Sequence, residues 1–229
     1  MSITRIMMQA AAGVKKGPTE IGQAFGGGFY AGKIVEGGTR YYIIVAPKSS
    51  GESSSKQFKT SNDAAPSATQ TLNNGPAASS SMNSATYPAA QFCEGLTIGG
   101  FSDWYLPARD ELELCYRNLK PTTSTNNTSN RQKSPITYPE RNDRSNDTMG
   151  VNRNSNPTGG AYTTFTPSQT SVTAFITGGT EAFASSGYYW SSSEFEPANA
   201  WWQGFINGFQ NGNFKNNYFY VRAVRRVPV

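Results

Sequence analysis

The stretch AWWQGFINGFQNGNFKNNYFYVRAVRRV, residues 200–227, mixes aromatic residues with asparagines over a length greater than one turn or one buried strand. If its first seven residues form a strand, Trp201 and Phe205 lie on one face and Trp202 on the other. The pair Asn211-Gly212 predicts a turn, and the closing YVRAVRRV predicts a final strand. One face of the first strand is then exposed unless a second layer covers it.

The composition favours a loop-rich, strand-containing protein of the extracellular or virion kind. Charged residues make up 15 % of the 229 residues, against roughly 25 % in ordinary soluble domains. The net charge is +5 and the pI is about 9.2. The basic residues are scattered, and no run of them exceeds Arg225-Arg226, so we expect no nucleic-acid partner.

The N-terminal residues predict neither export nor insertion into a membrane. Arg5 interrupts the apolar residues at the start, and no apolar run reaches the eighteen residues of a membrane span. We expect synthesis in a cytoplasm and release by assembly or lysis. We interpret residues 1–25 as an attachment segment and residues 26–229 as one domain.

The chain contains no histidine and two cysteines, which removes Ser-His and Cys-His dyads and most zinc sites. Its only clustered carboxylates are Asp103, Asp110, Glu111 and Glu113, and three of them fall in a first helical turn that is solvated or faces the helix dipole. We therefore expect no enzyme, no catalytic residue, no metal and no cofactor.

A β-hairpin is predicted near the N-terminus. Two apolar runs, 29–35 and 41–46, flank Gly37 and Gly38, which supply the positive φ of a tight turn. The next forty residues are rich in Ser, Ala, Asn and Pro and indicate a loop.

Two helices follow, over residues 88–96 and 107–119. Each begins with a proline and repeats apolar residues at i, i+3, i+4 and i+7. Cys93 and Cys115 fall on these apolar faces, so we expect them to be small buried side chains rather than ligands or nucleophiles. The pattern leaves open a disulfide between the two helices.

Residues 121–169 are almost wholly polar and show no sustained period, which is typical of a functional, interface or disordered loop. We expect this segment to act as an interface or a covering element. A short helix is predicted after it, with Val172, Phe175 and Ile176 facing inward and Gly178-Gly179 ending it.

The aromatic and asparagine side chains of the opening stretch suit an adaptable recognition surface. Aromatic rings give large contact areas with few torsions, and asparagine amides both donate and accept hydrogen bonds. Sugars match this chemistry, because ring faces stack on their C–H patches while amides pair with hydroxyls. The alternative is that these aromatics are core or oligomer contacts and that the asparagines occupy hairpin turns.

Three segments, GGFSDWYLPARDELELCYRNL, YYWSSSEF and the closing AWWQGF…NG…FK…VRAVRRV, resemble in that order the Lcl C-terminal domain family. This C-type-lectin-like group occurs in bacterial surface proteins and in phage fibre and tail-tip proteins. The resemblance extends over 26–229 and implies an α+β, C-type-lectin-like fold. Such a fold has small antiparallel sheets, two main helices and long loops, and its N- and C-terminal strands meet in one sheet.

Some members of the family are variable receptor-binding proteins whose C-terminal positions alternate between fixed and varied. The resemblance assigns the fixed scaffold to Trp190, Trp201, Phe205, Gly208, Val221, Arg222, Val224 and Arg225. It assigns the displayed, ligand-binding set to Trp202, Ile206, Asn207, Phe209, Asn211, Asn213, Phe214, Asn216, Asn217, Tyr218 and Tyr220.

Two relatives of this fold supply chemistry that the sequence does not match. Calcium-dependent lectins carry a Glu-Pro-Asn or Gln-Pro-Asp tripeptide, whereas this chain has EPAN at Glu196 to Asn199 and no acidic cluster beside it. Formylglycine-generating enzymes use a reactive cysteine pair in an open site, and here both cysteines face inward.

The resemblance implies a phage virion protein, either a fibre, a tail tip or a head decoration, assembled in the host cytoplasm. We expect it to bind a bacterial cell-surface glycan or protein, to contact other virion proteins, and to form a homotrimer. The alternatives are a purely structural capsid or tail component, or a bacterial surface adhesin.

Overall fold

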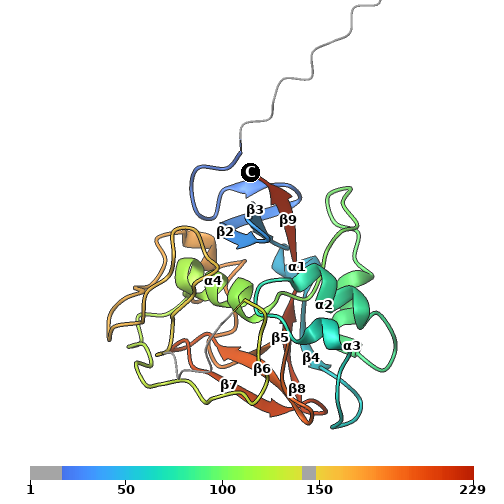
Figure 1. Ribbon diagram of the computed structural model, residues 1–229. Coiled ribbons are helices and arrows are strands. Elements are labelled where there is room, and N and C mark those ends of the chain that lie inside the picture. Colours follow the sequence, from blue (N-terminus) through green and yellow to red (C-terminus); the bar gives the residue numbers. More distant parts are fainter. Residues whose placement is uncertain (1–16, 141–147) are drawn as a thin grey trace, which may run out of the picture.

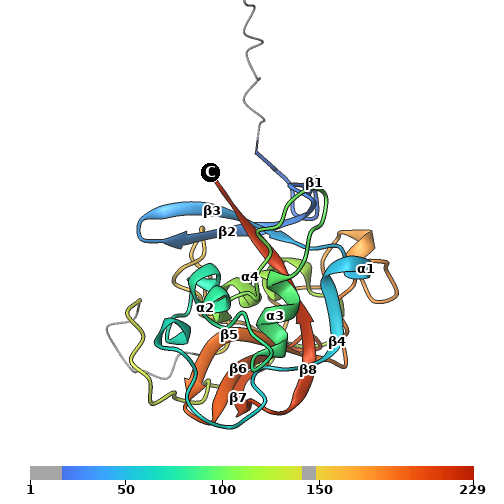
Figure 2. The ribbon, with the colours of Figure 1, turned by 90° about the vertical axis from the view of Figure 1, so that its right-hand side faces the viewer.

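A computed structural model describes residues 17–140 and 148–229, which fold into an α+β domain built on two sheets (Figures 1 and 2). The four-stranded sheet has the order β1-β2-β3-β9, with bounds Ala24–Phe25, Gly28–Glu36, Thr39–Val45 and Val224–Pro228. The five-stranded sheet has the order β4-β8-β5-β6-β7, with bounds Glu52–Gln57, Tyr218–Arg222, Tyr188–Glu196, Asn199–Gly204 and Gln210–Phe214. The predicted α+β class is confirmed.

The N-terminal hairpin forms as predicted. Strands β2 and β3 are antiparallel and are joined by Gly37 and Gly38, whose φ angles are 57° and 80°. These angles lie in the left-handed region that glycine enters without steric cost. Strand β1 adds to the outer edge of β2, so part of the expected attachment segment belongs to the sheet. Residues 1–16 of that segment lie outside the described residues.

The predicted single strand at the C-terminus is two strands in different sheets. Strand β8 pairs with β4 and β5, whereas β9 pairs with β3. Ala223 lies between them, donates its N–H to Gly51 and accepts from Ala46. The N- and C-terminal strands thus meet in one sheet, as the resemblance implied, but the strand pattern does not show where the chain changes sheets.

The described residues contain four helices, α1 (Lys48–Gly51), α2 (Gly75–Ser81), α3 (Pro88–Glu94) and α4 (Arg109–Leu119), with 3-10 turns at Ser67–Thr69 and Thr173–Phe175. The two predicted helices are confirmed as α3 and α4. The predicted loop after the hairpin is wrong in part, because it contains α1, β4 and α2. Helix α2 is capped by the Asn74 side chain, which accepts the N–H of Ala77 at 3.2 Å. The predicted short helix is the second 3-10 turn, with Phe175 buried inside it.

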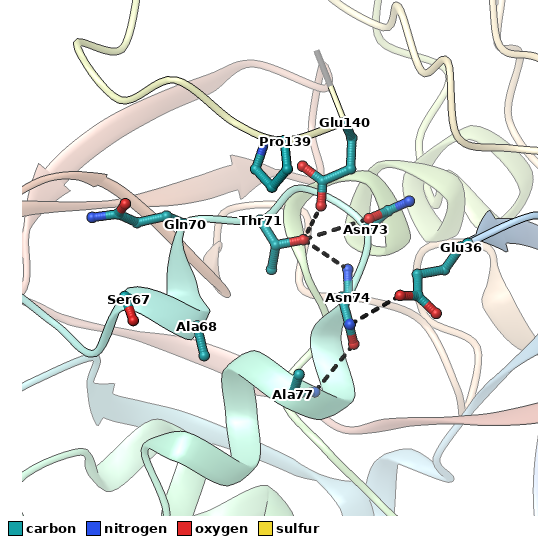
Figure 3. A pocket seen from close by; sticks show the side chains of 11 residues that line it. Glu36, Ser67, Ala68, Gln70, Thr71, Asn73, Asn74, Ala77, Pro139 and Glu140 are labelled. Atoms are coloured by element: carbon teal, nitrogen blue, oxygen red, sulfur yellow. Dashed lines mark hydrogen bonds between the residues drawn. The ribbon is translucent and has the colours of Figure 1, made fainter. Parts of the chain in front are cut away.

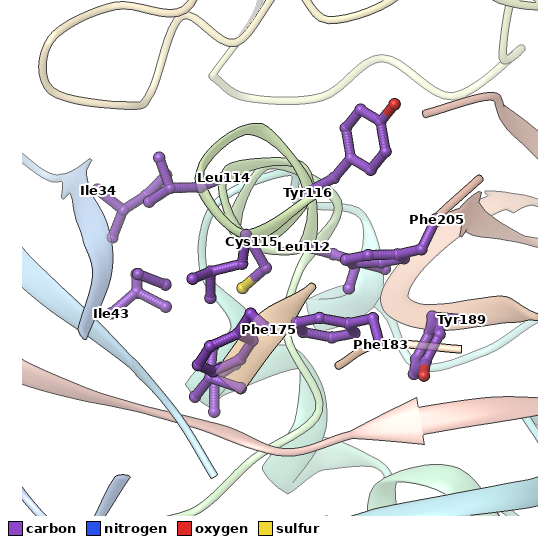
Figure 4. Close-up of a cluster of buried hydrophobic side chains, with 14 of the residues drawn as sticks. Ile34, Ile43, Leu112, Leu114, Cys115, Tyr116, Phe175, Phe183, Tyr189 and Phe205 are labelled. Atoms are coloured by element: carbon purple, nitrogen blue, oxygen red, sulfur yellow. The ribbon is translucent and has the colours of Figure 1, made fainter. Parts of the chain in front are cut away.

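The core has two main clusters, one on each face of the five-stranded sheet. Helix α4 packs with Tyr189 and Phe205 in the first cluster (Figure 4), where the rings of Phe183 and Phe205 stack at 4.0 Å. Helices α2 and α3 pack with Trp190 and Trp202 in the second. Since adjacent strand residues point to opposite faces, Tyr189 and Trp190 enter different clusters.

Both cysteines are buried and free. Cys115 lies in the first cluster and Cys93 in the second. The disulfide between α3 and α4 that the sequence left open is therefore not formed. Burial in an apolar environment raises the pKa of both thiols. Their predicted role as small buried side chains is confirmed.

The long polar segment covers α4 and one face of the sheet. Asn152 donates to a carboxylate oxygen of Glu113 at 2.7 Å, and Arg131 donates to the Gln210 side chain at 2.8 Å. Tyr138 donates to the backbone carbonyl of Glu194 at 2.6 Å. The described parts of the segment, 121–140 and 148–169, are held in place by these side-chain hydrogen bonds and not by helices or strands. The predicted covering role is confirmed. No helix in the described ranges is long and apolar enough to cross a membrane.

The carboxylates of α4 are buried, so the solvated alternative is wrong, while Asp110 and Glu111 do lie in the first turn of the helix. Asp110, Glu111 and Glu113 are at most 1 % exposed. Glu111 accepts hydrogen bonds from Tyr105 at 2.8 Å and from the Arg226 guanidinium at 2.7 Å. Arg226 comes from the last strand, and Asn152 and Tyr162 of the long segment bond to Glu113. The helical pattern alone does not reveal these distant partners. Burial raises the pKa of the Glu113 carboxyl.

Candidate functional site

The predicted binding residues lie at one edge of the five-stranded sheet and are divided between the two faces of that sheet. Strands β6 and β7 are antiparallel, with Trp202 opposite Asn211 and Trp201 opposite Gly212. Paired residues point to the same face and successive residues to opposite faces. Trp202 and Asn211 therefore share one face, and Trp201 lies on the other.

The predicted scaffold is buried throughout. Trp201 is 2 % exposed, donates its indole N–H to the Tyr138 hydroxyl at 2.7 Å and packs edge-on against Phe195 at 4.8 Å. The other predicted scaffold positions are also buried, namely Trp190, Phe205, Gly208, Val221, Arg222, Val224 and Arg225. Their expected place in the interior is confirmed.

Trp202 is 7 % exposed, so the prediction that its side chain is displayed is wrong. The rings of Tyr188, Phe209 and Phe219 surround it at centroid distances of 4.3, 5.6 and 5.9 Å. The second layer that the sequence left open is therefore present on this side. The indole N–H of Trp202 is enclosed and has no hydrogen-bond partner among the described residues.

A partly exposed surface surrounds Trp202, and we name it the aromatic–asparagine face. It consists of Tyr188, Trp202, Asn211, Asn213, Asn217 and Phe219. Its outermost ring is Tyr188, which is 46 % exposed and lies edge-on to Phe219 at 5.3 Å. Neither Tyr188 nor Phe219 belongs to the predicted binding set. Tyr188 precedes the stretch and joins it only in the folded sheet, whereas Phe219 lies within it, on the strand face opposite to the predicted Tyr218 and Tyr220.

The amides of this face are held by their oxygens. Asn213 Oδ1 accepts from Asn217 Nδ2 at 2.8 Å and from the N–H of Phe214 at 2.8 Å. Asn211 Oδ1 accepts from the N–H of Gly212 at 2.8 Å. The Nδ2 groups of Asn211 and Asn213 donate to no acceptor in residues 17–140 and 148–229, so both remain available to a ligand.

The remaining predicted residues lie elsewhere. Phe214, Tyr218 and Tyr220 are on the opposite face of the sheet, and the first two are 53 % and 64 % exposed. Ile206 and Asn207 form the turn between β6 and β7, where the backbone of Asn207 accepts from the N–H of Asn127. The other two residues outside the face, Asn216 in the β7–β8 turn and Phe209 beside Trp202, complete the set.

The predicted Asn211-Gly212 turn is wrong, because both residues lie within β7. The chain reverses instead near Gly208, whose φ is 74°. Gly212 has a different use, since a Cβ there would come within 2.4 Å of the Phe195 ring. The glycine that predicted a turn is therefore needed because the sheet leaves no space for a side chain at that position.

Ion pairs fix the strands behind the aromatic–asparagine face. Arg222 is fully buried and bonds to Glu181 at 2.8 Å and to Glu52 at 3.1 Å. Lys215, in the β7–β8 turn, is also buried and contacts Glu194 at 2.5 Å. Removing one partner of such a pair leaves an uncompensated buried charge, so these pairs tie the turn and the strand to fixed positions.

The residues compared with calcium-dependent lectins bond to each other. Glu196 and Asn199 pair across the β5–β6 turn, and the Asn199 amide donates to the Glu196 carboxylate. In the described ranges, no group of three or more His, Cys, Asp or Glu side chains is placed to hold a metal ion. The groups that the aromatic–asparagine face offers for binding are ring surfaces and amides.

The chain matches a known protein family. The family model of the Lcl C-terminal domain matches residues 52–225, about three quarters of the chain. The matched segment begins at β4, so the β2–β3 hairpin lies outside it, and it contains the whole aromatic–asparagine face. No curated protein matches the chain.

Proposed function

Because the chain belongs to the Lcl C-terminal domain family, we propose that it is a phage virion protein, of a fibre, a tail tip or a head decoration, that binds a bacterial surface receptor or glycan. The family is compatible with a receptor-binding or variable domain. The narrower assignment to a virion is carried by the resemblance to phage fibre and tail-tip members. The protein acts by binding and not by catalysis.

The observation that carries this proposal is the pairing of an exposed ring with unpaired amide donors. Tyr188 offers a ring face that is 46 % exposed, and Asn211 and Asn213 offer free N–H groups on the same side of the sheet. A sugar presents C–H patches to a ring and hydroxyl oxygens to amide donors. A peptide loop of a surface protein offers equivalent apolar and carbonyl groups, so the face accepts either class of receptor.

The support beneath the face favours binding without rearrangement. Trp202 lies under Tyr188, and the oxygens of both asparagines are already committed to hydrogen bonds. Side chains that are held before binding lose less conformational entropy when the ligand arrives. Binding at this face is independent of metal, since its donors are rings and amides and the Glu196–Asn199 pair is self-satisfied.

Several copies of the binding face on one particle compensate for a low affinity of each single site. We propose a homotrimer that also contacts other virion proteins, with the exposed apolar residues of the opposite side as subunit contacts. Phe165 in the long segment is 75 % exposed, and Phe214 and Tyr218 are 53 % and 64 % exposed. Several copies engaging one cell raise the apparent affinity through effective concentration.

The same exposed residues favour one other candidate, a purely structural capsid or tail component. In that role Phe165, Phe214 and Tyr218 contact neighbouring subunits and the aromatic–asparagine face has no ligand. A host-binding measurement separates the two candidates.

The test measures attachment of fluorescently labelled protein to a panel of bacterial strains, with and without EDTA. We expect Tyr188→Ala and Asn211→Ala to reduce attachment strongly, and EDTA to leave it unchanged. Phe101→Ala is the control, because Phe101 is a 37 % exposed aromatic residue that lies neither on this face nor among the proposed subunit contacts. Normal attachment of Tyr188→Ala and Asn211→Ala would refute the receptor-binding assignment and favour the structural one.

A further inference from the structure

The outermost strands of the two sheets differ in how their free edges are protected. A strand edge presents unpaired N–H and C=O groups to which a strand of another chain can add, and natural sheets block it with charges, proline, bulges or very short strands. Strand β4 contains Lys56 and an irregular register, β9 contains Pro228, and β1 has two residues. Strand β7 has the sequence QNGNF, with no charged residue and no proline, and its pairing with β6 is regular. Its edge therefore needs another form of protection.

The pairing of β7 with β6 determines which backbone groups of β7 face away from the sheet. Just beyond β7, the N–H of Lys215 bonds to the carbonyl of Ala198, and hydrogen-bonded pairs alternate with unbonded pairs along an antiparallel ladder. Gly212 and Phe214 occupy unbonded pairs, so their N–H groups point outward. Gly212 has no side chain, so its partial exposure is exposure of its own backbone. The edge is thus accessible from Gly212 to Phe214, whereas Gln210 at its other end is fully buried.

An asparagine side chain occupies each of these two outward N–H groups. Asn211 Oδ1 accepts the N–H of Gly212 at 2.8 Å. Asn213 Oδ1 accepts the N–H of Phe214, also at 2.8 Å. Each asparagine thus bonds to the N–H of the residue that follows it. The accessible part of the edge therefore offers no free N–H donor to a second strand.

Asparagine oxygens have the same use at another place in the chain. Asn74 Oδ1 accepts the N–H of Ala77 at 3.2 Å, one of the N–H groups that the start of α2 leaves unpaired (Figure 3). The Nδ2 group of Asn74 donates to Glu36 at 3.1 Å, so the oxygen and the nitrogen of one amide have different partners. In β7 the oxygens likewise bond to the backbone, which leaves the Nδ2 groups to the ligand contacts proposed above.

We propose that Asn211 and Asn213 protect the edge of β7 against strand addition by a second copy of this chain. A second copy presents the same uncharged edge, and two such edges can pair antiparallel about a two-fold axis without repulsion between like charges. Addition of that strand has to break the bonds from both asparagine oxygens before the outward N–H groups can pair. This role belongs to the amide oxygens and does not depend on the receptor binding proposed for the Nδ2 groups.

The test compares the self-association of the wild type and of Asn211→Ala/Asn213→Ala by sedimentation velocity over a range of concentrations. Alanine removes both acceptor oxygens and frees the outward N–H groups. We expect species larger than the wild-type assembly to form at a concentration about tenfold lower or less, as for the gain of intermolecular backbone hydrogen bonds. With purified protein, only a second copy can supply the added strand. Association of the double variant equal to that of the wild type would overturn the proposal.

Two further changes show whether this association uses the strand edge. Adding Phe214→Pro to the double variant removes an outward N–H, whereas adding Phe214→Ala removes the same ring and keeps the N–H. We expect the alanine triple variant to associate as the double variant does and the proline triple variant to lose this association. Association that persists with proline would assign it to another surface and would overturn the proposal.

Circular dichroism and thermal melting establish that each variant is folded before its association is compared. The single variants Asn211→Ala and Asn213→Ala free one N–H each and replace the double variant if that variant does not fold. We expect each single variant to associate more than the wild type. Association of both at the wild-type level would count against the proposal in the same way.

Discussion

The two neighbouring tryptophans of β6 are both buried, but they differ in the hydrogen bonding of their indole N–H groups. Trp201 faces the side covered by the long polar segment, and its indole N–H bonds to Tyr138 at 2.7 Å. Trp202 faces the side covered by α2, α3 and flanking rings, and its indole N–H has no partner in residues 17–140 and 148–229. Within the described residues, the covering chain thus supplies a partner for the first indole N–H and none for the second, although Arg109 Nη1 over the Trp201 ring is also unbonded. On the second side, the donors that a ligand can reach are the Asn211 and Asn213 amides and not the enclosed indole.

The largest expected effect tests whether both faces are interior at this strand. Trp201→Ala and Trp202→Ala should each reduce the free energy of unfolding by about 3 to 5 kcal/mol, the range for truncating a large buried ring. Chemical denaturation measures both. A Trp202→Ala variant as stable as the wild type would show that Trp202 is displayed, as the sequence pattern suggested, and would break the comparison.

A smaller effect isolates the hydrogen bond that distinguishes the two residues. Trp201→Phe and Trp202→Phe remove the same atoms, but only the first removes a satisfied N–H donor. We expect Trp201→Phe to cost about 1 to 2 kcal/mol more than Trp202→Phe. Equal losses in denaturation curves would mean that the bond between Trp201 and Tyr138 contributes nothing to stability.

The smallest effects belong to the outermost residues of the aromatic–asparagine face. Asn211→Ala should change the free energy of unfolding by no more than about 0.5 kcal/mol, the usual range for surface positions. Tyr188→Ala should stay within about 1 kcal/mol, because its ring is half exposed. Thermal denaturation measures both, and a loss comparable to that of Trp202→Ala would make these residues part of the packing.

Local patterns predicted the elements whose cause is local. The Gly37-Gly38 hairpin, helices α3 and α4, and the burial of Trp201 follow from turn chemistry and periodicity within a few residues. Strand β4 was missed because its sequence, ESSSKQ, is polar and becomes a strand by pairing with β8. Tertiary pairing overrode propensity there.

The candidate site was predictable only in part, since its members meet across strands. Asn211 and Asn213 were found from composition, whereas Tyr188 joins them only through the register of β5 with β6. Trp202 was assigned to the surface because strand alternation cannot say whether a second layer exists.

The change of sheet at Ala223 has a mechanical consequence. The backbone that leaves the five-stranded sheet in β8 continues directly into β9, which is paired with β3 over five positions. Tension applied to the five-stranded sheet therefore passes along the chain into β9. That strand is loaded parallel to its axis, so its hydrogen bonds to β3 share the force and must break together. The domain resists pulling in this direction through shear of one strand pair and not through the peeling of single bonds.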